Sequence, residues 1–211
     1  MDKLQIQHSF IQFTIENNHF PKSIEDFSDY LEISTTEFYQ YYSSLKDVDS
    51  DIWLQTFLET KQKLYETEVY PQYSGREKVL AFYYTWLEVL KENRNFILIS
   101  ARRKAFLDLK PYFLEELKNN FYVWLNDILL EGKETQEIYQ RMFTEKIYPK
   151  AFWGLTLGVL KFWINDNSEN FENTDIFVEK SVNFSFDAIG KTFLDSGIEL
   201  GKFVFQRWFK F

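Results

Sequence analysis

The side chains that most often catalyse reactions or bind metal ions are scarce and poorly spaced in this sequence. The chain has no cysteine and only two histidines, His8 and His19, both near the N-terminus. No HxxxH or HExxH spacing occurs, so a zinc protease site lacks its ligands. Glu115 and Glu116 are adjacent on a predicted helix, so their carboxylates point about 100° apart and cannot form a catalytic pair. We therefore predict no enzyme, no metal site and no cofactor.

The first fifty residues carry the pattern of three short helices. We expect the first helix to end near Asn18, because asparagine tolerates the left-handed conformation at a helix C-cap. Ser23 is placed to cap a second helix and Ser34 a third. Phe38 and Tyr42, four residues apart, give the third helix an apolar inward face. Two short helices joined by a few residues describe a helix-turn-helix, whose second helix enters the major groove of DNA.

Residues 23–48 resemble the DNA-binding domain of the TetR family of bacterial transcriptional regulators. The family pattern is a Gly that ends the first helix, then T-S-hydrophobic-x-D-I-A, then G-V-S-x-x-x-hydrophobic-Y-x-H-F, then a K-E/D-L start to the fourth helix. The matching positions are Asn18, residues 23–27, Ile33 and Ser34, Phe38 and Tyr39, Tyr42, and Asp47 and Val48. The sequence departs from the pattern at three positions, namely the turn glycine (Glu32), the third-helix histidine (Tyr41) and the lysine that follows (Leu45).

The resemblance implies an all-α protein of about nine or ten helices, and the rest of the chain also has helical periodicity. A helix-turn-helix domain would occupy residues 1–46, and a larger bundle for ligand binding and dimerisation residues 47–211. The expected partners are double-stranded DNA, an apolar small molecule and a second copy of the chain. No stretch approaches the roughly 18 apolar residues of a membrane helix. The lack of cysteine suits a reducing compartment, so we expect a soluble, cytoplasmic protein without a membrane partner.

The charge of the helix-turn-helix segment argues against DNA binding. The chain carries 24 Lys+Arg and 32 Asp+Glu, a net charge of −8. Through residue 50 there are three lysines and nine carboxylates, a net charge of −6, which leaves −2 for the rest of the chain. Phosphate contacts supply most non-specific affinity for DNA, which carries one negative charge per ~1.7 Å of duplex. The alternative is a protein of this fold that has lost DNA binding and binds a lipid-like ligand or a protein partner.

Neutral hydrogen-bond donors and two lysines of this segment could still contact DNA. Hydroxyl and amide groups donate to phosphate oxygens, and Glu37 is placed to accept a hydrogen bond from cytosine N4. The predicted DNA-binding residues are Lys22, Ser23, Thr35, Thr36, Glu37, Tyr39, Gln40, Tyr41 and Lys46.

Two predicted helices of the larger region, at residues 77–91 and 111–131, carry large aromatic side chains on one face. In TetR-like proteins the corresponding helices enclose a ligand cavity, and an aromatic lining suits a flat or long apolar ligand. The alternative is that these side chains fill the core, since 20% of all residues are aromatic. The predicted ligand-binding residues are Phe82, Trp86, Leu90, Phe113, Leu117, Phe121 and Trp124.

Residues 149–164 are apolar on more than one face, which predicts a helix buried on both sides. Either this helix is central in its domain, or one face meets a second subunit. Gly154 and Gly158 would let another helix approach closely. In the resembled family the last two long helices of each subunit form the dimer interface, so we expect a two-fold homodimer. The predicted interface residues are Phe152, Leu155, Val159, Phe162, Val178, Val182, Ile189 and Phe193.

Overall fold

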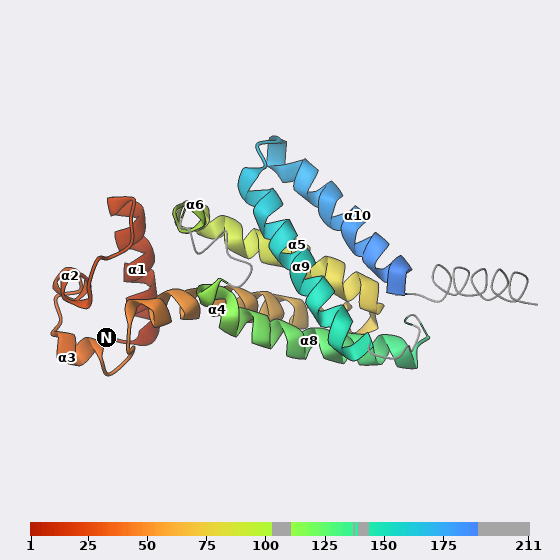
Figure 1. The fold of residues 1–211 in the computed structure, drawn as a ribbon, viewed down its shortest axis with the longest axis horizontal. Coiled ribbons are helices and arrows are strands. Elements are labelled where there is room, and N and C mark those ends of the chain that lie inside the picture. The colour runs from red at the N-terminus through yellow and green to blue at the C-terminus, as the bar shows by residue number, and fades with distance from the viewer. Residues whose placement is uncertain (103–110, 137, 139–143, 190–211) are drawn as a thin grey trace, which may run out of the picture. The chain divides into compact units, whose positions relative to one another are not determined.

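The computed structural model describes residues 1–102, 111–136, 138 and 144–189 (Figure 1). This part of the chain contains nine α-helices and no strand, which confirms the predicted all-α fold. None of its helices combines the length and the hydropathy that a membrane span requires. The α-helices are α1 (Lys3–Asn17), α2 (Ile24–Tyr30), α3 (Thr35–Phe38), α4 (Leu45–Tyr65), α5 (Gly75–Glu92), α6 (Arg94–Ala101), α8 (Glu115–Glu134), α9 (Thr144–Asn165) and α10 (Glu172–Ile189), with 3-10 helices η1 (Tyr70–Gln72), η2 (Tyr112–Leu114) and η3 (Glu169–Phe171).

The chain divides into two compact units. Unit 1 contains Met1–Glu66 and Thr85–Phe121, and unit 2 contains Thr67–Tyr84 and Tyr122–Phe211. Helices α5 and α8 each contribute residues to both units. The functional division expected between residues 1–46 and 47–211 follows a different boundary and stays a prediction.

The first four helices each begin at a side chain that accepts a hydrogen bond from the helix's own backbone. Asp2 accepts from the N–H of Gln5, whose side chain accepts in return from the Asp2 N–H, so the pair forms a capping box. Ser23, Ser34 and Ser44 cap α2, α3 and α4. Each cap satisfies an N–H that has no partner within the helix, which stabilises the fold by about 1 kcal/mol. The predicted caps Ser23 and Ser34 are confirmed.

Aromatic rings hold the N-terminal helices together. Phe10 of α1 meets Phe27 of α2 edge-on with ring centres 5.4 Å apart, and Phe27 lies 6.2 Å from Phe38 of α3. Phe96 of α6 joins the cluster 6.4 Å from Phe10. All four rings are at most 1% exposed. Helix α6 is therefore part of the core that supports the helix-turn-helix, although it lies far along the chain.

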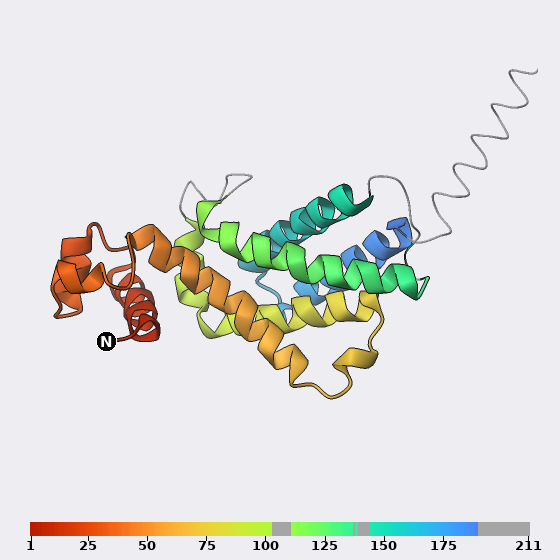
Figure 2. The same ribbon diagram turned by 90° about the horizontal axis from the view of Figure 1, so that it is seen from below.

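Helix α4 is the central element of unit 1. In both views, α1, α2 and α3 gather around its first turns (Figure 1, Figure 2). Further along, its fully buried Trp53 packs against Phe113 with ring centres 5.5 Å apart. The Trp86 indole of α5 donates to the Thr56 hydroxyl of α4 at 3.0 Å. Thus α4 connects the N-terminal helices with α5 and η2.

Helices α9 and α10 pair within unit 2, where Phe152 and Phe186 lie 5.6 Å apart between ring centres. Helix α9 begins at Thr144, five residues before the predicted start at residue 149, so Pro149 lies inside it. Proline has no N–H, so one carbonyl of the preceding turn loses its usual donor. Gly132 lies in the last turn of α8, which ends at Glu134. A Cβ at Gly132 would come within 2.7 Å of the Ile138 side chain, so the position requires a small residue.

The connection between α9 and α10 is organised by Asp166. One carboxylate oxygen accepts from the N–H and hydroxyl of Ser168 at 2.9 and 2.7 Å, and the other from the N–H and hydroxyl of Thr174 at 2.9 and 2.6 Å. Burial raises the pKa of Asp166, but these hydrogen bonds to the charged form outweigh it and lower the pKa from 3.8 to about 2.

Replacing Asp166 with Asn should lower the free energy of unfolding by about 1–3 kcal/mol, because the amide turns an NH₂ group toward two donors. The native pKa lies below the unfolded one, so the carboxylate's contribution is present above about pH 4 and is lost as the pH falls toward 2. Urea unfolding should therefore show the difference between wild type and Asp166→Asn shrinking over that range. The control Asp187→Asn alters an exposed ion pair and should cost less than 1 kcal/mol. An equal cost for both variants would contradict this account.

Candidate nucleic-acid interface

The turn between α2 and α3 has the geometry of a helix-turn-helix. Helix α2 ends at Tyr30 with Leu31 as its C-cap, and Glu32 then adopts a left-handed conformation with φ of 56°. The Ile33 N–H donates to the Ser28 carbonyl at 3.1 Å, which closes the turn before the Ser34 cap. Asn18, at the end of α1, has a φ of 55°. The two positions where the resembled pattern has glycine are thus both left-handed here, as expected for Asn18 but not for Glu32.

Helix α3 presents a short polar surface. Its buried Phe38 anchors the helix, while Thr36, Tyr39 and Gln40 are exposed. Thr35 and Glu37 are half-buried. The structure therefore brings together the exposed side chains of the predicted DNA-binding set on one short helix and the turn that follows it.

Two other predicted DNA-binding residues are engaged within the chain. The half-buried Tyr41 donates its hydroxyl hydrogen to the Met1 carbonyl. The exposed Lys46 holds its ammonium group 5.4 Å from the centre of the Tyr112 ring, an arrangement of the cation–π kind. Lys22 is exposed, and Ser23 next to it is the α2 cap.

Several acidic residues of this segment lie in the first turns of helices. Asp2 caps α1, Glu25 and Asp26 lie in the first turn of α2, Glu37 in that of α3, and Asp47 in that of α4. Negative side chains at helix N-termini are stabilising because the helix dipole is positive there. Hydrogen bonding to the backbone and to Ser23 lowers the pKa of Glu25. The same carboxylates occupy helix ends that could otherwise receive a phosphate.

A partly buried hydrogen-bond triangle joins α1, the turn that follows α3, and α4. The Tyr42 hydroxyl donates to the Asp51 carboxylate at 2.7 Å, and the Gln7 side-chain NH₂ donates to both at 2.9 Å. Burial and then the Asp51 contact raise the pKa of Tyr42, so its hydroxyl stays protonated. Sequence reasoning missed this group; the available signal was Gln7, a polar residue one helical turn before the core residue Phe10.

All seven predicted ligand-binding residues are buried. Their side chains are at most 3% exposed, which accords equally with a core role and with a closed cavity. Leu90 is set apart from the others because it also lines a groove of unit 1. The ligand-binding assignment stays a prediction.

The predicted dimer residues divide into two groups. Five of them are already buried in the single chain and offer no surface to a partner, namely Phe152, Val159, Val178, Val182 and Ile189. Leu155 is half-buried and Phe162 is 39% exposed. Phe193 lies outside the described residues. The exposed apolar residues of the same two helices are instead Ile147, Phe162, Ile176 and Phe184.

The described residues contain no cluster of three potential metal ligands. Comparison with known families matches residues 78–204 to the family described as "Tetracyclin repressor-like, C-terminal domain". No curated protein matches the chain. No solved structure matches it either. The match covers the region after the helix-turn-helix, so it supports the resemblance from outside the segment whose motifs carried it.

Replacing Glu32 with Gly should raise the free energy of unfolding by about 0.5–1 kcal/mol. A left-handed L-residue costs about 1–2 kcal/mol, and the extra freedom of glycine in the unfolded chain offsets part of that gain. Glu32→Ala is the matched control, because it removes the same carboxylate but keeps the strained backbone. Equal stabilisation by both variants in urea unfolding would assign the effect to charge and contradict the conformational explanation.

Proposed function

The chain belongs to the TetR family of transcriptional regulators, and from that premise we propose that it is a dimeric DNA-binding regulator that responds to an apolar small molecule. The observation that carries the proposal is the helix-turn-helix, in which α3 and the turn after it expose Thr36, Tyr39 and Gln40 above an aromatic core. On binding, these groups would donate to phosphates and base edges, and Lys22 and Lys46 would supply the cationic contacts.

A second candidate function is a protein of this fold that has lost DNA binding. The net charge of −6 through residue 50 favours it, as do the carboxylates of Glu25, Asp26 and Glu37 in the first turns of α2 and α3. These groups repel phosphate where helix N-termini would otherwise attract it. Such a protein would bind a lipid-like ligand or a protein partner instead.

The proposed effector is apolar because the predicted ligand-binding residues are apolar and buried. Phe82 and Trp124 lie 4.5 Å apart between ring centres in unit 2, and Phe113 packs on Trp53 in unit 1. A ligand that packs against rings of this kind would gain mainly from burial of apolar surface. If the ligand binds one conformation of the dimer more tightly than another, it would shift the dimer toward that conformation. The spacing of the two helix-turn-helix heads would then change.

The proposed dimer uses the exposed faces of α9 and α10. Phe162 stacks on Phe177 with ring centres 4.7 Å apart, and Phe162 remains 39% exposed. Ile176 and Phe184 of α10 are 46% and 72% exposed. Among the described residues, a Cβ built at Gly154 meets no atom within 4 Å beyond its own helix, so this side of α9 can receive a partner helix. Burying this patch against its copy would remove apolar surface from water.

For DNA binding, we expect the dimer to bind a duplex from the region upstream of its own reading frame with weak salt dependence. Two lysines in each of two heads neutralise about four phosphates, which gives a slope of log K against log salt of about −3.6. Tyr39→Ala should lower the affinity about tenfold by removing one phosphate contact. Tyr65→Ala is the matched control, since Tyr65 is 58% exposed and Tyr39 56%.

Fluorescence anisotropy at several salt concentrations measures the salt slope of the wild-type dimer and the DNA affinities of the Tyr39→Ala and Tyr65→Ala variants. If the wild-type dimer does not bind at low salt, the regulator proposal fails and the second candidate stands. For that candidate, native mass spectrometry of protein purified without detergent should show a retained apolar ligand.

For the dimer, Gly154→Leu should convert the protein to a monomer in analytical ultracentrifugation, because the new side chain holds the partner helix away. Gly154→Ala should leave the isolated chain folded and stabilise α9 by up to about 1 kcal/mol. The control is Asn126→Leu on the exposed surface of α8. A dimer that tolerates Gly154→Leu would rule out this face as the interface.

A further inference from the structure

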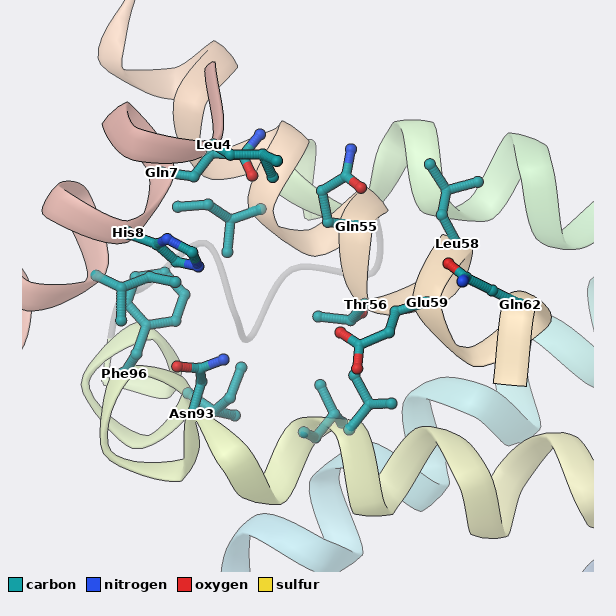
Figure 3. Close-up of a pocket in the computed structure, with 15 residues that line it drawn as sticks. Leu4, Gln7, His8, Gln55, Thr56, Leu58, Glu59, Gln62, Asn93 and Phe96 are labelled. Atoms are coloured by element: carbon teal, nitrogen blue, oxygen red, sulfur yellow. The ribbon is translucent and has the colours of Figure 1, made fainter. Parts of the chain in front are cut away.

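A groove of about 310 Å³ lies in unit 1, between α1 and α4 on its sides and the junction of α5 and α6 beneath (Figure 3). Apart from Leu90, it is lined by residues that the predicted ligand-binding set does not contain. Its volume is in the range of small-molecule sites, which begin at about 300 Å³. The groove is therefore a candidate binding site separate from the predicted aromatic cavity.

The floor of the groove is apolar and rigid. Ile52 of α4, Val89 and Leu90 of α5, and Phe96 and Ile97 of α6 line it, and each is at most 5% exposed. Such a floor suits a flat ring or an aliphatic body. It supplies affinity by removing apolar surface from water.

Two polar groups of the groove, on Gln7 and Thr56, are held by hydrogen bonds within the chain and leave acceptors for a ligand. Gln7 donates through its NH₂ group to Tyr42 and Asp51, so its carbonyl oxygen is the group left for a ligand. The Thr56 hydroxyl donates its hydrogen to the Trp53 carbonyl and accepts from the Trp86 indole. Its oxygen therefore has one lone pair left, with which it can only accept from a ligand. Because the Asp51 carboxylate can only accept, the Gln7 NH₂ group must face it, and the Gln7 carbonyl oxygen must point the other way.

Glu59 gives the groove a negative charge. Its carboxylate points into the groove from α4 (Figure 3) and is half-buried. One of its oxygens is 2.8 Å from the Lys63 ammonium, which also contacts Glu92 at 3.2 Å. The two carboxylates outnumber the single lysine, so the local charge stays negative and opposes the entry of an anion.

We propose that this groove binds a small organic cation, an ammonium group on an apolar ring. The ring lies on the floor formed by Ile52, Leu90 and Phe96. The ammonium group donates to the Glu59 carboxylate, and the oxygens of Gln7 and Thr56 accept from further donors of the ligand. Every fixed polar partner in the groove is then satisfied by a donor, which neither an anion nor a hydrocarbon provides.

Occupation of the groove would act on the helix-turn-helix through Gln7. The same side chain faces the ligand and holds Tyr42 and Asp51, so a bound cation contacts both α1 and α4 and stabilises their arrangement. A site that bridges two helices shifts an equilibrium only if its affinity differs between their arrangements. Binding itself does not depend on the proposed function, because it is measured without DNA.

Isothermal titration of the full chain with tryptamine, and with its neutral analogue tryptophol, tests the proposal. We expect tryptamine to bind about fivefold more tightly than tryptophol, because one partly screened ion pair changes the affinity by about that factor. Glu59→Gln should abolish this preference by weakening tryptamine about fivefold and leaving tryptophol unchanged. Glu88→Gln is the matched control, because Glu88 is an exposed partner of Lys91 on α5 that does not line the groove.

A filling substitution tests the location. Gln55 points into the groove from α4 (Figure 3), and Gln55→Phe should weaken both compounds while circular dichroism shows an unchanged helix content. The proposal is overturned if the folded protein binds neither compound, if tryptophol binds as tightly as tryptamine, or if Glu59→Gln and Glu88→Gln behave alike. If DNA binding fails while the tryptamine preference remains, only the regulator function is lost.

Discussion

The helix-turn-helix depends on the hydrogen-bond triangle of Gln7, Tyr42 and Asp51. It joins α1, the turn after α3 and α4 through three side chains. Gln7 donates to Tyr42 and to Asp51, and Tyr42 donates to Asp51. Aromatic packing around Phe10 fills the space between these helices, but packing alone tolerates small shifts. Hydrogen bonds between groups shielded from water do not tolerate such shifts, because a lost partner leaves a desolvated polar atom. The triangle therefore determines how α3 is held against α4.

The acidity of the N-terminal segment has a structural explanation that its composition does not reveal. The carboxylates of Asp2, Glu25, Asp26, Glu37 and Asp47 are distributed over the N-termini of four helices, and Asp49 is buried against the Tyr112 hydroxyl. Helices α2 and α3, with seven and four residues, cannot rely on length for stability, so their end interactions matter more. Stability of the fold and attraction to phosphate thus make opposite demands on the same positions.

Sequence patterns predicted local features well and long-range ones poorly. Ser23, Ser34 and Asn18 were placed correctly because caps depend on residues within one helical turn. Helix α4 begins at Leu45, two residues before the expected start, since Ser44 supplies the cap. The family resemblance came from the same local pattern. In contrast, the inward face of α9 could not be derived from a helix that is apolar all round, so the buried Val159 and the exposed Phe162 were assigned together to one interface. The groove beside Gln7 combines four helices, and no sequence window contains it.

Helix α4 also has a consequence that follows from its length alone. Its 21 residues form one continuous helix, which at 1.5 Å per residue makes a rod about 31 Å long. A tilt of about five degrees around one end displaces the other by roughly 2.7 Å over that length. The contacts of Trp53 and Thr56 lie near its middle, where the same tilt produces about half that movement. A displacement at the centre of the helix is thus about doubled at the end opposite the pivot.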